Sequence, residues 1–224
     1  MTDITTPVTT KSRPPLESRW PATLAVVAAI VLYVTLPASL VLGPRWILPA
    51  LEGAILVPLT VARPHRHAGE AGPSRIAAIV LIAIANVGNV ASLVLLIHDL
   101  LVHGGAITGR TLVFAAIQIY LTNVIIFGLW YWELDAGGPA RRLAGDARFP
   151  DFLYPQMNAP NHAPSGWRPH FIDYLYVSLT NATAFSPTDT MPLTHLAKIL
   201  MGLQSVASLL TVALVAGRAV NILN

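Results

Sequence analysis

The sequence contains no cysteine and few charged residues. The absence of cysteine excludes disulfide bonds, thiolate metal ligands and cysteine nucleophiles from all 224 residues. Charged residues make up 11% of the chain, against roughly 25% in ordinary soluble domains, whereas 54% of the residues are hydrophobic. This composition predicts an all-α fold, a polytopic membrane helical bundle. The formal net charge of +3 comes from loop arginines, which indicate membrane orientation and no nucleic-acid partner.

The signatures of catalysis are also missing. We find no phosphate-binding loop, no nucleophile–base pattern and no paired carboxylates. One scattered group could supply metal ligands, but without the tight spacing that a metal site needs: His162, His170, Asp173 and His195. We therefore expect no enzymatic activity, no cofactor and no metal.

Long apolar runs dominate what is present. Residues 1–20 are polar and are expected to form a disordered tail, followed by a retained first span. Five hydrophobic helices are predicted at about 21–43, 46–62, 75–102, 110–134 and 192–222. Pro37 is expected to kink the first of them. The first three helices form an N-terminal part, residues 21–109.

The second part, residues 110–224, has a different organisation. A Pro/Gly-rich connection, 135–169, precedes an aromatic half-helix, 170–185, and a polar loop, 186–191. A helix of about 15 residues is too short to cross a bilayer, which needs roughly 20. Polar, non-helical backbone survives at membrane depth only where protein or water covers it. This pattern predicts a re-entrant segment before the last helix.

The residues around this segment resemble the pore domain of two-transmembrane potassium channels. Many bacterial members have D-x-x-P-x-T-x-x-x-R after the filter, and this chain has Asp189, Pro192, Thr194 and Lys198 at the same spacing. The resemblance covers roughly residues 110–222 and implies a homo-tetramer. The constriction would be lined by Thr180, Thr183, Phe185, Ser186, Thr188 and Asp189.

The filter itself departs from the channel pattern. A potassium filter stacks backbone carbonyls and needs glycines in left-handed conformations. This chain has no glycine between Ile172 and Leu200, and Pro187 restricts the backbone where the glycines would lie. A pore here would therefore not be potassium-selective by the usual filter.

Two further segments resemble an uncharacterised family of bacterial integral membrane proteins. They are W-x-L-D-x-G-G-P at Trp132–Pro139 and F-S-P-T-D at Phe185–Asp189. This resemblance implies no particular activity. The scarcity of lysine among 14 basic residues also suggests bacterial coding, and we expect a multi-pass protein of the bacterial inner membrane.

Three polar residues fall within the predicted N-terminal helices. Glu52 could be an ion or proton site, or an acid near a helix end paired with Arg45. Asn86 and Asn89 are three residues apart and share a helix face. They favour hydrogen bonding between helices over substrate binding. Asp189 could likewise be a helix N-cap as well as a pore-lining residue.

The charge distribution and the channel resemblance predict opposite orientations. Ten basic residues fall on the side of the tail, the second loop and the long connection, and two, Arg45 and Arg110, on the other. The positive-inside rule then places the N-terminus and the connection in the cytoplasm. A channel pore loop, by contrast, enters the membrane from outside. This orientation would be restored if the predicted helix 46–62 did not cross the membrane. We give the charge bias the greater weight.

The sequence thus favours an ion-channel-like membrane protein in the lipid bilayer, as a homo-oligomer. Two alternatives stay open. One is a non-conducting scaffold or sensor. The other is a small transporter that uses Glu52 with the Asn86 and Asn89 face.

Overall fold

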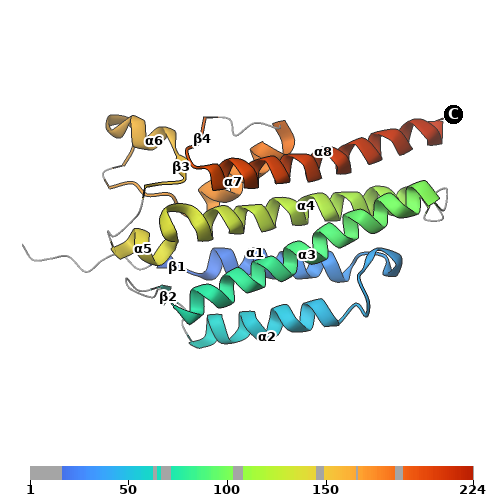
Figure 1. The fold of residues 1–224 in the computed structure, drawn as a ribbon, viewed down its shortest axis with the longest axis horizontal. Helices are drawn as coiled ribbons and strands as arrows, with labels where there is room; N and C mark the ends of the chain where they lie inside the picture. Colours follow the sequence, from blue (N-terminus) through green and yellow to red (C-terminus); the bar gives the residue numbers. More distant parts are fainter. Residues whose placement is uncertain are drawn as a thin grey trace, which may run out of the picture.

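The computed structural model describes residues 17–62, 65–66, 72–102, 108–144, 149–164, 166–184 and 189–223. Long helices lie side by side in a bundle (Figure 1). The main helices are α1 (Trp20–Val34), α2 (Ile47–Ala62), α3 (Pro73–Val102), α4 (Gly109–Leu134), α7 (Phe171–Ala184) and α8 (His195–Leu223). The short helices are η1 (Ala38–Leu40), η2 (Asp135–Gly137), α5 (Pro139–Ala144), α6 (Pro155–Asn158) and η3 (Pro160–His162). Two-residue strands pair as β1 (Glu17–Ser18) with β2 (His65–Arg66), and β3 (Phe152–Leu153) with β4 (Met191–Pro192).

Three helices are long and apolar enough to cross a membrane: Pro73–Val102, Gly109–Gly137 and His195–Arg218. The all-α class is confirmed, and the three long apolar helices are consistent with the predicted membrane protein. The other two predicted spans correspond to shorter apolar helices, α1 with 15 residues and α2 with 16. A bilayer core needs roughly 20 helical residues, so length alone does not make α1 and α2 spans.

The first helix is shorter than the pattern predicts because of Pro37. Instead of kinking at Pro37, α1 ends at Val34, and the chain continues through η1. Proline restricts the residue before it and cannot donate a backbone hydrogen bond, so helices usually end ahead of it. The Thr35 hydroxyl donates to the Val31 carbonyl at 2.8 Å and closes the last turn.

Helix α2 runs back along the bundle. The segment that follows it, β2, pairs antiparallel with β1, which precedes α1, so the two helices leave and return to one end. The predicted disordered tail falls mostly on residues outside the described part, and its residues 17 and 18 form β1. This path is the one expected if residues 46–62 traverse the bundle.

Helix α4 is the centre of the bundle. In the most apolar 18-residue stretch of α4, 61% of the residues are buried inside the bundle, against 22% in the corresponding stretch of α8. It contacts α1, α3, α7 and α8. Small, fully buried side chains on α4, such as Ala115 and Ala116, allow close approach of its neighbours.

Candidate functional site

Helix α7 lies against the second half of α4 and runs antiparallel to it. Near the start of α7, the Phe171 ring meets Trp132 edge-on, with ring centroids 5.7 Å apart. Farther along, Ser178 donates to the Val124 carbonyl at 2.6 Å. Near the end, the Thr183 hydroxyl lies 3.0 Å from the Tyr120 hydroxyl. Since α4 runs from Gly109 to Leu134, α7 stops near its middle.

The chain returns to the end from which α7 started. Strand β3, before α7, pairs with β4, after it. The Leu193 amide also donates to the Asp151 carbonyl at 2.8 Å. Helix α8 then starts from this end and runs the length of the bundle (Figure 1). The segment between β3 and β4 is therefore an excursion to mid-bundle and back.

A polar cluster in the bundle interior joins α7 to α4 and α8. At its centre is Gln204 of α8, which is fully buried. Its side-chain oxygen accepts hydrogen bonds from Tyr131 at 2.5 Å and Asn181 at 2.9 Å. Its nitrogen donates to the Ser178 hydroxyl at 2.7 Å. Because each partner comes from α4 or α7, one amide fixes the position of the half-length helix.

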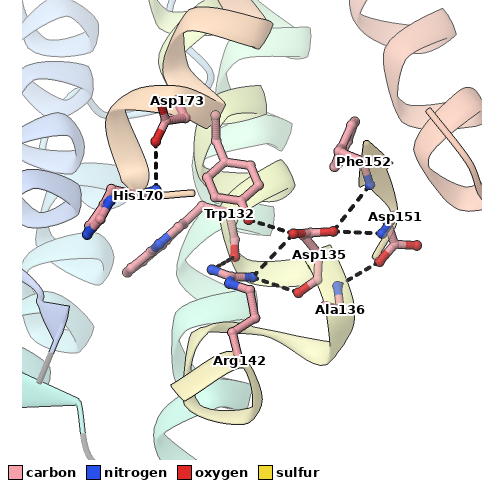
Figure 2. A network of polar contacts seen from close by, with 9 residues as sticks. Trp132, Asp135, Ala136, Arg142, Asp151, Phe152, His170 and Asp173 are labelled. Atoms are coloured by element: carbon pink, nitrogen blue, oxygen red, sulfur yellow. Dashed lines mark hydrogen bonds and ion pairs between the residues drawn. The ribbon is translucent and has the colours of Figure 1, made fainter. Parts of the chain in front are cut away.

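A second cluster anchors the start of α7, with Asp135 at its centre (Figure 2). The Asp135 carboxylate is 1% exposed and accepts hydrogen bonds from the Tyr174 hydroxyl at 2.5 Å and the Asp151 amide at 2.7 Å. Arg142 donates to the Asp135 carbonyl at 2.6 Å and lies 3.9 Å from its carboxylate. The guanidinium also covers the Tyr174 ring, 5.1 Å from the centroid. Buried charge is tolerated here because it is paired and hydrogen-bonded.

The Gly-Gly turn after Asp135 makes this geometry possible. Ala136, Gly137 and Gly138 all have positive φ, at 53°, 84° and 99°. Glycine adopts this region without the steric cost that a Cβ imposes. The turn directs α5 back so that Arg142 reaches the carboxylate.

Asp151 links this cluster to α8. Its carboxylate accepts hydrogen bonds from the Ala136 amide at 3.0 Å and from the Thr194 hydroxyl at 2.5 Å. The Thr194 oxygen also accepts from the Ala197 amide at 3.2 Å, so it caps the first turn of α8. The threonine of the channel-like pattern therefore acts as a helix cap and a link to the connection.

Three of the six residues predicted to line a constriction lie within the described part of the chain. Thr180 is half-buried, and its hydroxyl donates to the Tyr176 carbonyl of its own helix at 3.0 Å. Thr183 and Asp189 are exposed. Phe185, Ser186 and Thr188 lie outside the described residues.

Of the three polar residues predicted as a possible ion or proton site in the N-terminal helices, two are buried and one is half-buried. Glu52 is 5% exposed and Asn89 is 4% exposed. Asn86 is half-buried, and its side-chain oxygen has no hydrogen-bond partner in the described part of the structure. The structure shows no hydrogen bond between Glu52 and either asparagine across the described ranges. The Tyr33 ring of α1 packs against Gly88, next to Asn89 on α3.

Sequence reasoning missed the residues that organise the site: Asp135, Arg142, Tyr174 and Gln204. Asp135 lies within the W-x-L-D-x-G-G-P segment, and Arg142 follows that segment, but neither was assigned a role. A usable signal was an acid at the end of an apolar helix, followed directly by two glycines. Gln204 offered a weaker signal, as one amide within a long apolar run.

Tyr154 is one residue of the connection that packs against the start of α7. It is 3% exposed, and its ring packs edge-on against Tyr174, with centroids 5.6 Å apart. Burial, reinforced by the charges of Asp135 and Asp173, raises the pKa of Tyr154 well above its ordinary value. This part of the connection is thus packed against the site.

Comparison with known proteins found no matching family, no matching curated protein and no matching solved structure.

Proposed function

We propose that this chain is a channel-like membrane protein, in which α7 is a re-entrant half-helix and α8 lines a pore between four copies. Five hydrophobic helices cross the bilayer in this proposal, α1 and α2 included. The narrowest point is formed by the chain from Thr183 to Asp189.

One observation carries the proposal: α7 stops near the middle of α4, and the chain returns to its starting end. A long helix, a half-length helix and a second long helix in this order are what a pore loop requires. The anchors at Asp135 and Gln204 support it, because a half-helix needs fixed partners to hold a polar loop at mid-depth.

The charge at this point favours cations. The C-terminal end of a helix carries roughly half a negative charge. Helix α7 has no basic residue in its last turn, and Asp189 follows it. We therefore propose conduction of cations without the discrimination of a glycine-based filter.

The test is ion flux into liposomes that contain the purified protein. We expect cation flux above that of protein-free liposomes, little chloride flux, and reduced cation flux for Asp189→Asn. Thr183→Val tests the constriction, and Thr60→Val is its control, because the Thr60 hydroxyl also donates to its own helix, at Leu56, but on α2. The absence of flux together with a monomeric or dimeric particle contradicts the proposal and favours a scaffold or sensor.

A second function, small-molecule transport coupled to a proton at Glu52, is favoured by the burial of that acid, which is 5% exposed. Under this alternative, Glu52→Gln abolishes pH-dependent uptake, whereas Thr183→Val leaves it intact.

A further inference from the structure

An open cavity of about 620 Å³ lies at the end of the bundle where α3 and α8 begin and α4 ends. Arg75 enters it from the first turns of α3, Leu134 from the last residue of α4, and Leu196 from the start of α8. These three helices are the ones long and apolar enough to cross a membrane. In a bilayer spanned by these three helices, a cavity at their common end would lie at the level of the lipid headgroups.

Two arginines converge on this cavity across the Gly-Gly turn. A Cβ on Gly137 would lie 2.9 Å from Cδ of Arg141, and one on Gly138 would lie 3.1 Å from Nε of Arg75. The two side chains therefore pack against consecutive residues of one turn. Only glycine leaves room for both at this backbone conformation.

The guanidinium of Arg141 is available to a ligand. It makes no ion pair or hydrogen bond with any residue that the structure describes. Arg75 is 28% exposed and lies 3.8 Å from Glu133, and its Nε has no hydrogen-bond partner within the described part of the chain. Arg141 therefore offers unused donors to an anion, and Arg75, whose Nε is buried beside Glu133, adds positive charge to the cavity wall.

The remaining polar lining is already engaged. Asp151 accepts hydrogen bonds through both carboxylate oxygens, from Thr194 and from the Ala136 amide. Both of its oxygens are thus engaged by hydrogen bonds within the fold. The exposed ring of Phe149 lines the same cavity and gives it an apolar flank.

We propose that this cavity binds the phosphate group of an anionic lipid headgroup. Guanidinium groups pair with phosphate through parallel hydrogen bonds. Basic pockets between membrane helices at the cytoplasmic surface are a known means of recognising anionic headgroups. The apolar flank formed by Leu196 and Phe149 suits the start of the acyl chains. The inference depends on membrane embedding but not on ion conduction.

The test uses the full-length protein, purified in detergent and stripped of lipid. Binding of phosphatidylglycerol, phosphatidylcholine and inorganic phosphate is titrated by thermal shift and native mass spectrometry. We expect phosphatidylglycerol to bind more tightly than phosphatidylcholine and to raise the unfolding temperature. Inorganic phosphate is expected to have little effect at the same concentration. This comparison needs no variant, so it does not depend on the folding of one.

Variants then locate the site. Arg141→Gln should weaken phosphatidylglycerol binding roughly fivefold, the effect of about one basic residue near an anionic surface. Arg141→Lys should retain most of the affinity. Arg110→Gln, at the opposite end of the bundle, is the control and should not change it. Equal binding of the two lipids, or an unchanged affinity in Arg141→Gln, overturns the proposal. If inorganic phosphate at equal concentration displaces the lipid, the cavity binds free phosphate and not a lipid headgroup, and the proposal is overturned.

Discussion

At the scale of single residues, the two tyrosines in the connection and at the start of α7 form a natural matched pair. Both are buried, and their rings touch. Tyr174 donates to the buried carboxylate of Asp135, whereas the Tyr154 hydroxyl has no hydrogen-bond partner in the described part of the protein. We expect Tyr174→Phe to lower the free energy of unfolding by about 2 kcal/mol, because a buried carboxylate loses a donor.

Tyr154→Phe should change the free energy of unfolding by less than about 0.5 kcal/mol at neutral pH, since it removes no described hydrogen bond. Chemical unfolding in detergent micelles measures both variants. Equal losses in the two would show that Asp135 does not depend on the Tyr174 hydroxyl.

The same residue gives a prediction for alkaline pH. The pKa of Tyr154 is raised in the folded protein by burial, then by the charges of Asp135 and Asp173. The unfolded chain loses this proton near pH 10 while the folded chain keeps it. Stability therefore falls as pH rises above about 10, and Tyr154→Phe should flatten this fall. Unfolding curves between pH 8 and pH 11, on both proteins, measure the difference. Parallel curves would contradict the assignment.

At the scale of elements, α7 is fixed by one amide of α8. Replacing Gln204 with leucine removes the side-chain bonds to Tyr131, Asn181 and Ser178. Hydrogen bonds between membrane helices contribute about 0.6 kcal/mol each, so we expect a loss of about 2 kcal/mol. Faster hydrogen exchange confined to α7 should accompany it.

Ser205→Ala is the control for Gln204→Leu, because it removes a single contact of 3.3 Å to Asn181. It should cost well under 1 kcal/mol. If both variants cost the same, Gln204 does not determine the position of α7.

The helices could be predicted from the sequence, but the contacts between them could not. Apolar runs and breakers place α2, α3 and α4 within two residues of their observed bounds. Pro37 was correctly recognised as a perturbation, yet its effect depends on the loop that follows it. The Asp135 cluster joins residues 135, 142, 151 and 174 from separate segments. No local pattern specifies such a pairing, whereas the short length of α7 follows directly from its flanking breakers.

At the scale of the whole molecule, basic residues gather at one end of the bundle. Arg75, Arg141 and Arg142 lie at the end where α3 begins and α4 stops, together with β1–β2. The positive-inside rule predicts that this end faces the cytoplasm. The excursion containing α7 would then enter from the cytoplasmic side.

The absence of cysteine makes this orientation testable. We expect Asn161→Cys, in the connection, to react with a membrane-impermeant maleimide only after cell lysis. Thr108→Cys, at the opposite end, should react in intact cells; both residues are exposed. The reverse pattern would establish the orientation of a channel pore loop and overrule the charge bias.

The central claim is that the end of α7 meets water at mid-membrane. Thr183→Cys in liposomes tests it most directly, with Ile117→Cys as the control. Ile117 is an exposed apolar residue one turn from Tyr120, which contacts Thr183. We predict that a small, charged thiol reagent modifies Cys at 183 and reduces cation flux, while Cys at 117 stays unmodified. Equal lack of reaction at both positions would place the end of α7 in lipid or packed protein and contradict the pore.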